Sequence, residues 1–260
     1  MPYPKLIECL NLDVTESCLN RALAKQGYRR QIALKKPFIS EKNHLLRLEW
    51  AEEHVNWEDE DWDNILWTDE SWVKGGRHRK TRVTRRTGEE LHEDCVTLKI
   101  QCKRGWMIWG CINGSEKGPC LFWEKEWGTI NSETYSERIV PIIHGWMTLN
   151  PHLQLMQDGA PEHGAKNTQE ELNSRGIYPI FWPPYSPDLN PIETLWNIMK
   201  DYIDDTYPLE HNPTYDRLWV IVKEAWDMLD VEKVKELTSG SYMRAHCQAV
   251  IDANGKYTKY

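Results

Sequence analysis

The sequence has few of the features that mark secreted, membrane or zinc-binding proteins. No apolar run approaches the ~20 residues that a membrane-spanning helix needs, and the first residues contain no apolar signal core. Seven cysteines occur without a Cys-x-x-Cys pair, and their odd number argues against a disulfide framework. These absences predict an intracellular protein with reduced thiols and without a membrane partner or a zinc-type metal site.

Positive charge is also scarce: the sequence has 32 Lys and Arg residues against 40 Asp and Glu residues, which gives a net charge of −8. Residues 51–70 hold nine acidic residues and no Lys or Arg, whereas residues 74–86 hold seven basic residues and no acidic one. A basic stripe beside an acidic centre suits a nucleic acid bound through its phosphates, and a solvated charged hairpin fits the pattern equally well. The basic residues are Lys74, Arg77, Arg79, Lys80, Arg82, Arg85 and Arg86.

The length of 260 residues and the 40% hydrophobic content suffice for one sizeable core with a small appended module. The fourteen tryptophans are expected mainly in packing. Residues 15–26 form a helix candidate ended by Gly27, with too few apolar positions for a core of its own. We therefore divide the chain into a helical segment at 1–30, a linker and helix at 31–62, and a main domain at 63–260.

Within the main domain the hydrophobic pattern changes to strands and then to alternating strands and helices, which is typical of a mixed sheet flanked by helices. The expected strands are Asn64–Asp69, Arg82–Arg86, Cys95–Gln101, Trp106–Ile112, Leu153–Asp158 and Ile177–Trp182. The expected helices are Asn131–Leu149, which continues through Pro141, Ala165–Arg175, and one that starts at Asn190.

Three carboxylates lie where an apolar run gives way to a turn or a helix start: Asp69, Asp158 and Glu193. The last two are separated by 34 intervening residues. Divalent ions such as Mg²⁺ need hard oxygen ligands that converge on one point, and a fold supplies them from neighbouring element ends. The pattern predicts a two-metal centre for phosphoryl transfer on nucleic acid.

Each acid also has an ordinary structural explanation. Asp69 could simply end a strand, and Asp158-Gly159 is a common turn dipeptide. Asn190, Pro191 and Glu193 match a capping box, in which the Glu side chain folds back on the helix start. A side chain folded back in this way could not also reach a metal.

Three motifs resemble those of the Tc/mariner superfamily of transposases. The first runs from Thr68 to Ser71, the second from Gln157 to Pro161 with His163, and the third from Trp182 to Glu193 with Trp196. The spacing of 34 residues also matches the Tc branch. The similarity extends over nearly the whole chain.

The resemblance implies an RNase H-like fold with a mixed five-stranded sheet, and a D,D,E metal triad of Asp69, Asp158 and Glu193. It implies two Mg²⁺ ions per site, replaceable by Mn²⁺, which assist cleavage and joining of double-stranded DNA at transposon ends and target sites. A homodimer and a nuclear location are further expectations. Glu70 is excluded from the triad because a regular strand turns it to the opposite face. His163 stays open between a site residue and a surface or cap histidine.

Departures from the family pattern define the alternatives. Family members usually begin with two helix-turn-helix modules, and here only the final helix of the second is expected, around residues 14–26 within the segment 1–30. The chain is thus expected to be N-terminally truncated, and Gly159 stands where Asn is common. One alternative is a catalytically idle, host-retained or truncated transposase that acts as a DNA- or protein-binding module. Another is an RNase H-like nuclease that acts on other nucleic acids, which the third motif disfavours.

Overall fold

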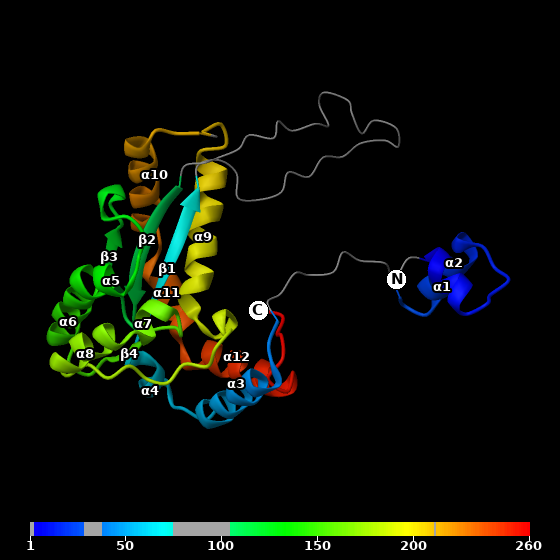
Figure 1. Ribbon diagram of the computed structural model, residues 1–260, viewed down its shortest axis with the longest axis horizontal. Helices are drawn as coiled ribbons and strands as arrows, with labels where there is room; N and C mark the ends of the chain where they lie inside the picture. The colour runs from blue at the N-terminus through cyan, green and yellow to red at the C-terminus, as the bar shows by residue number, and fades with distance from the viewer. Residues whose placement is uncertain (1–2, 29–37, 75–104, 211) are drawn as a thin grey trace. The chain divides into compact units, whose positions relative to one another are not determined.

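The computed structural model describes residues 3–28, 38–74, 105–210 and 212–260 (Figure 1). The chain divides into two units, Met1–Phe38 and Ile39–Tyr260. The expected strands Arg82–Arg86 and Cys95–Gln101 lie outside the described residues. In the described part of the chain, no helix is long and apolar enough to cross a bilayer.

The first unit contains two short helices, α1 (Tyr3–Cys9) and α2 (Glu16–Lys25). The Thr15 hydroxyl caps α2 by accepting a hydrogen bond from the Cys18 amide at 3.3 Å. Gly27 follows the helix with a φ of +82°, a backbone conformation that glycine adopts without steric cost. The expected helix and its glycine stop are therefore present.

The second unit is built on a sheet of strand order β3-β2-β1-β4 in the described residues. The central strand β1 (Ile65–Lys74) pairs antiparallel with β2 (Gly105–Ile112) and parallel with β4 (Gln154–Met156). The edge strand β3 (Lys117–Phe122) pairs antiparallel with β2. The sheet is mixed, as the sequence pattern predicts.

The expected strand Ile177–Trp182 is wrong, and the described sheet has four strands. The segment runs beside β4, where the Ile180 amide donates to the Leu155 carbonyl at 2.9 Å. Among the described residues this is the one backbone hydrogen bond between the segment and β4, and a paired strand requires a repeating ladder of such bonds.

Two apolar clusters lie on opposite faces of the sheet, because successive side chains of a strand alternate. Leu66 packs in the cluster beneath α5 (Ser132–Arg138), α6 (Val140–Leu149) and α8 (Lys166–Ser174). Ile65 and Trp67 pack in the cluster beneath α9 (Pro191–Thr206) and α10 (Tyr215–Asp227). The remaining helices of this unit are α3 (Glu41–His54), α4 (Asp59–Asp63), α7 (Pro161–Gly164), α11 (Val231–Thr238) and α12 (Gly240–Asp252), with 3-10 turns η2 (Lys125–Trp127) and η3 (Pro187–Leu189).

The expected helix Asn131–Leu149 is divided into α5 and α6 at Ile139. Pro141 lies in the first turn of α6. Proline lacks the amide hydrogen that a helix interior uses, but a first turn has no intrahelical partner for that hydrogen. The proline therefore starts a second helix instead of continuing the first.

A buried arginine connects α3 to the loop before α9. Arg47 is fully buried, and its guanidinium forms a bidentate pair with Asp188 at 2.8 and 2.7 Å. The same guanidinium donates to the carbonyls of Gly255 at 3.0 Å and Lys256 at 3.3 Å. We call this set the Arg47 clamp; it links α3, η3 and residues 255–256.

Candidate active site

The three predicted acids come from three adjoining elements. Asp69 lies within β1, Asp158 two residues beyond β4, and Glu193 in the first turn of α9. The last paired residues of the parallel strands are Trp67 and Met156. Asp69 and Asp158 are each two residues beyond that pair, on strands that run ~4.8 Å apart.

Two buried hydrogen bonds connect the backbone close to all three acids. The Thr68 hydroxyl donates to the Met156 carbonyl at 2.7 Å, which joins β1 to β4. The Asn190 side-chain amide donates to the Thr68 carbonyl at 3.4 Å, which joins the start of α9 to β1. Each acid follows one of these residues by one to three positions, so the bonds fix the relative places of the acids.

The Asp69 carboxylate faces α9. Trp196 donates its indole N–H to Oδ2 of Asp69 at 2.8 Å. Gly110 is the partner of Asp69 on β2, and a Cβ atom there would lie 2.9 Å from the Trp196 ring and 2.8 Å from the Trp226 ring. The glycine therefore leaves room for the indole that holds Asp69.

Negative charge accumulates at this position. Burial, followed by the charges of Glu193 and Glu70 and by that of Asp158, raises the pKa of Asp69 well above its ordinary value. Burial raises the pKa of Glu193, as does the Asp158 charge, while Lys200 opposes the shift. The three predicted acids thus act on one another electrostatically.

The Glu193 side chain does not form the capping box that the sequence allows. Asn190 caps α9, and its side-chain oxygen accepts a hydrogen bond from the Ile192 amide at 3.4 Å. Reciprocal capping boxes occur at α4 and α5. Among the described residues, no hydrogen bond joins the Glu193 carboxylate to the Asn190 backbone, so that carboxylate is free to act in the site.

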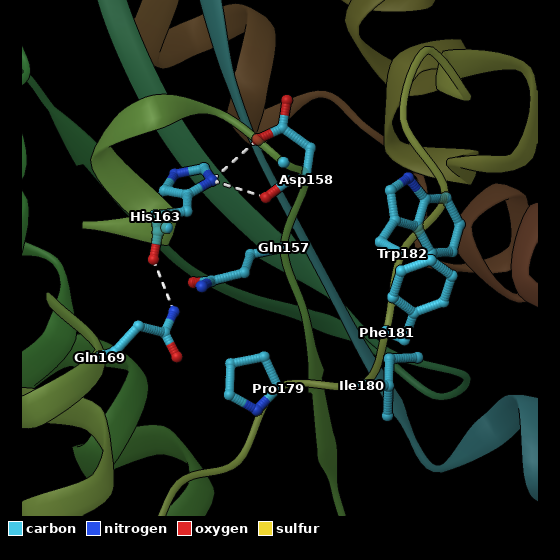
Figure 2. Close-up of a pocket in the computed structure, with 10 residues that line it drawn as sticks. Gln157, Asp158, His163, Gln169, Pro179, Ile180, Phe181 and Trp182 are labelled. Atoms are coloured by element: carbon cyan, nitrogen blue, oxygen red, sulfur yellow. Dashed lines mark hydrogen bonds and ion pairs between the residues drawn. The ribbon is translucent and has the colours of Figure 1, made fainter. Parts of the chain in front are cut away.

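Asp158 is held by a buried histidine (Figure 2). His163 Nδ1 contacts Oδ1 of Asp158 at 2.7 Å, and the Ala160 amide donates to the same oxygen at 3.0 Å. On the other side of the ring, Nε2 lies 3.5 Å from Oε1 of Glu70. Glu70 thus turns away from the face of Asp69, as strand alternation predicts, and His163 is a buried residue of the site.

These contacts determine the charges of His163 and Asp158. Burial alone would lower the pKa of His163, but the Asp158 and Glu70 carboxylates outweigh it and raise that pKa to about 10. Burial alone would raise the pKa of Asp158, but the hydrogen bonds from His163 and the Ala160 amide leave it below its ordinary value. At neutral pH the group is an imidazolium beside an ionised Asp158.

A cavity of about 240 Å³ opens beside Asp158. Gln157, His163 and Gln169 form its polar side, and the segment Pro179–Trp182 forms its apolar side (Figure 2). The volume is below the range of about 300–1,000 Å³ that is typical of sites for whole small-molecule ligands. The cavity therefore gives Asp158 access to solvent without enclosing a large molecule.

The donor set fits hard divalent cations, because three carboxylates supply oxygens and mutual repulsion makes a cation favourable there. In the ranges that the structure describes, no three acidic, histidine or cysteine side chains are close enough to hold one ion as they stand. Asp69 and Asp158 each have one oxygen engaged by a neighbour, Trp196 or His163. Joint coordination therefore requires the carboxylates to turn toward one another.

Sequence patterns missed several residues of this site. Lys200 lies seven positions after Glu193 on α9, and it is half-buried near the Glu193 and Asp69 charges. Its helical spacing from Glu193 is the signal that could have identified it. Of the seven predicted DNA contacts, Lys74 lies exposed at the end of β1, and the other six are outside the described residues.

The sheet is mixed and flanked by helices, and its acids come from β1, the end of β4 and α9. This combination defines the class of RNase H-like enzymes that transfer phosphoryl groups in nucleic acids. The profile of the DDE superfamily endonuclease family matches residues 64–213, which include all three acids. The chain belongs to this family. A second profile, described as a transposase and of the Tc3 helix-turn-helix type, matches residues 3–56.

Curated relatives and solved structures agree with this assignment. The Tc1 transposase of Caenorhabditis elegans is 29% identical over 251 residues, which cover 93% of this chain and 87% of the relative. The Tcb1 transposase of Caenorhabditis briggsae is 29% identical with the same coverage.

A Mos1 transposase paired-end complex with the left transposon end superposes with a TM-score of 0.80 at 17% identity, over all of this chain and 76% of that one. The catalytic domain of Mos1 mariner transposase gives a TM-score of 0.65 at 14% identity, over 87% of this chain and all of that one. The RNase H-like fold class is confirmed.

Proposed function

We propose that the protein cleaves and joins DNA strands in transposition, with Asp69, Asp158 and Glu193 as ligands of two Mg²⁺ or Mn²⁺ ions. The observation that carries the proposal is the electrostatic coupling of these acids at one edge of the sheet, inside the region that matches the endonuclease family. Solved Mos1 mariner complexes with Mn and with Mg support the choice of metals.

When bound, the two ions would stabilise the attacking and leaving oxygens of an in-line displacement at a phosphodiester. The protein holds the acids in place for this step. Trp196 fixes Asp69, His163 fixes Asp158, and the Asn190 cap fixes the start of the helix that carries Glu193. Lys200 offsets part of the negative charge beside Glu193.

The same proposal assigns roles to the rest of the chain. Residues 1–30 would contribute to recognition of transposon ends, since their match to a transposase profile supports a DNA-reading role. Residues 31–62 would connect them to the catalytic domain at 63–260. The basic residues from Lys74 to Arg86 would contact DNA phosphates. Paired-end complexes of Mos1 support a homodimer that works on two ends. A nuclear location is a further part of the proposal.

A nicking assay on supercoiled plasmid DNA with Mn²⁺ tests the proposal. Glu193→Gln keeps the shape of the side chain but removes the charge of a ligand, so we expect nicking to fall below detection. Asp158→Ala should have the same effect. The matched control is Asp205→Asn, which removes an exposed acid from the same helix and should leave nicking unchanged. Full metal-dependent nicking by Glu193→Gln would contradict the assignment of the third ligand. Absence of metal-dependent nicking by the wild type would instead favour a non-catalytic DNA- or protein-binding role.

A further inference from the structure

The two oxygens of the Asp158 carboxylate have different surroundings. Oδ1 is bound twice, by His163 Nδ1 at 2.7 Å and by the Ala160 amide at 3.0 Å. For Oδ2, no hydrogen bond or ion pair is formed with any residue in the described ranges. The protein therefore binds Oδ1 of Asp158, and Oδ2 stays available to a ligand as far as the described residues are concerned.

The ring of His163 has a fixed orientation. Nδ1 faces two acceptors, Oδ1 of Asp158 and the Asp158 carbonyl at 3.1 Å, so this nitrogen must carry a hydrogen (Figure 2). Gln169 donates to the His163 carbonyl at 2.6 Å, and the Tyr135 ring packs on the imidazole with a centroid distance of 4.5 Å. Tyr135 is held in turn by its hydroxyl, which donates to Gln157 at 3.1 Å.

Glu70 completes the arrangement from the adjacent strand. Its Oε1 and His163 Nε2 lie 3.5 Å apart, and both atoms are buried without a hydrogen bond in the described part of the chain. Burial of an unpaired carboxylate is costly, so the imidazole is the group that stabilises Glu70 there, and Glu70 holds the ring in return. Strand β1 thus carries Asp69 on one face, and on its other face it carries Glu70, which supports Asp158 through His163.

We propose that Glu70 and His163 are positioning residues that reserve Oδ1 of Asp158 for the protein, so that Asp158 offers the catalytic cation one oxygen, Oδ2. The proposal rests on the proposed function, because it concerns the same metal site. A ligand with one oxygen favours Mg²⁺, which takes six ligands in near-ideal octahedral geometry. Ca²⁺ takes about 6–8 oxygens and accepts carboxylates through both oxygens. Glu70 and His163 would therefore contribute to the choice between these two ions.

The test is Mn²⁺ binding to the full chain, measured by electron paramagnetic resonance with Mg²⁺ and Ca²⁺ as competitors, alongside thermal unfolding of each variant. For His163→Ala we expect Mn²⁺ affinity to fall by about 10–100-fold, the usual effect of removing a residue that orients a metal ligand. Because Oδ1 is released, Ca²⁺ should compete better relative to Mg²⁺ than it does in the wild type. Glu162→Ala removes the neighbouring acid and is the matched control, with wild-type binding expected.

A conservative variant separates positioning from general loss of structure. His163→Asn keeps an amide donor near the place of Nδ1 but cannot reach Glu70, so it should restore most of the affinity and the Mg²⁺ preference. Glu70→Ala should weaken binding in the wild type and have no further effect in the His163→Asn background, because Glu70 acts through the ring. Equal Mn²⁺ affinity and ion preference in the wild type and His163→Ala would overturn this inference but leave the proposed function standing. A wild-type chain that neither binds Mn²⁺ nor nicks DNA would overturn the proposed function and this inference with it.

Discussion

The Asp69 carboxylate is buried close to other negatively charged side chains. Its pKa is raised well above the ordinary value, chiefly by burial and then by the charges of Glu193 and Glu70. A raised carboxyl pKa means that the metal-free folded protein holds a proton that the unfolded chain has already released. Stability of the metal-free protein therefore falls as pH rises from the ordinary pKa of Asp toward the raised one.

Asp69→Asn should remove this pH-dependent loss of stability. Below the ordinary pKa of Asp, both states of the wild type are protonated, and the substitution should change the free energy of unfolding little. At neutral pH without metal, the variant should be more stable, with Tm higher by about 2–4 °C for each 1 kcal/mol gained. Thermal unfolding from acid to neutral pH in a chelator checks the prediction. Added Mg²⁺ should stabilise the wild type and not the variant, and a variant less stable than the wild type at neutral pH would contradict the proposed charge repulsion.

Among the elements, β2 approaches side chains of α9 and α10 closely at Gly110. Gly110 lies opposite Asp69, and the rings of Trp196 and Trp226 fill the space where a side chain would start. Any Cβ atom at this position pushes on the indole that donates to Asp69.

Gly110→Ala should therefore harm both stability and activity. Overpacking of this kind costs about 1–3 kcal/mol, and misplacement of a site group by about 1 Å can cost about 10²-fold in rate. Chemical denaturation and the plasmid nicking assay measure the two effects. Gly145→Ala in α6 is the control, because no atom outside its own helix and chain neighbours lies within 4 Å of the added Cβ. It should keep nicking intact and gain up to about 1 kcal/mol in stability; equal behaviour of the two variants would argue against the close contact.

The elements also show what the sequence could and could not predict. The strands β1, β2 and β4 have clear apolar patterns, so the sequence predicted where they lie. The expected end of the first strand at Asp69 was wrong, because β1 continues to Lys74 as it pairs with β2. β3 was missed because Gly118 and Pro119 lie inside it and all its residues are half-buried. Pro141 explains the division of the helix at Ile139.

The acids of the site were predictable from motifs, but their supports were not. Thr68 bonds to a residue 88 positions away, and Asn190 to one 122 positions away. Contacts at such separations depend on the completed fold and leave no local pattern. For the same reason the sequence could not decide whether Glu193 caps its own helix, which depends on a side-chain direction.

For the molecule as a whole, a net charge of −8 must be reconciled with a DNA substrate. Affinity for DNA grows with the number of phosphates that basic residues neutralise, so the local arrangement of charge matters more than its sum. The residues from Lys74 to Arg86 are the densest run of basic residues in the sequence.

Replacement of Arg77, Arg79 and Lys80 by Ala should weaken DNA binding about equally for all sequences. The slope of log affinity against log salt should become shallower by about 0.9 for each lost phosphate contact. Fluorescence anisotropy over a range of salt concentrations measures both. The control replaces Lys166, Lys233 and Lys235, which carry the same total charge on helices α8 and α11. Matching losses in the two triple variants would show that net charge, and not a contact surface, determines binding.

The Arg47 clamp has a consequence for the order in which the molecule is completed. Arg47 bonds to Asp188, 141 positions later, and to the Gly255 carbonyl, 208 positions later. Thr258 donates to the same Asp188 carboxylate at 2.8 Å. A nascent chain that has emerged as far as α9 already contains all three acids, but the turn that leads into that helix still lacks its partners from residues 255–258. During synthesis the loop before α9 therefore acquires this support only once residues 255–258 have emerged, after all three acidic residues have been made.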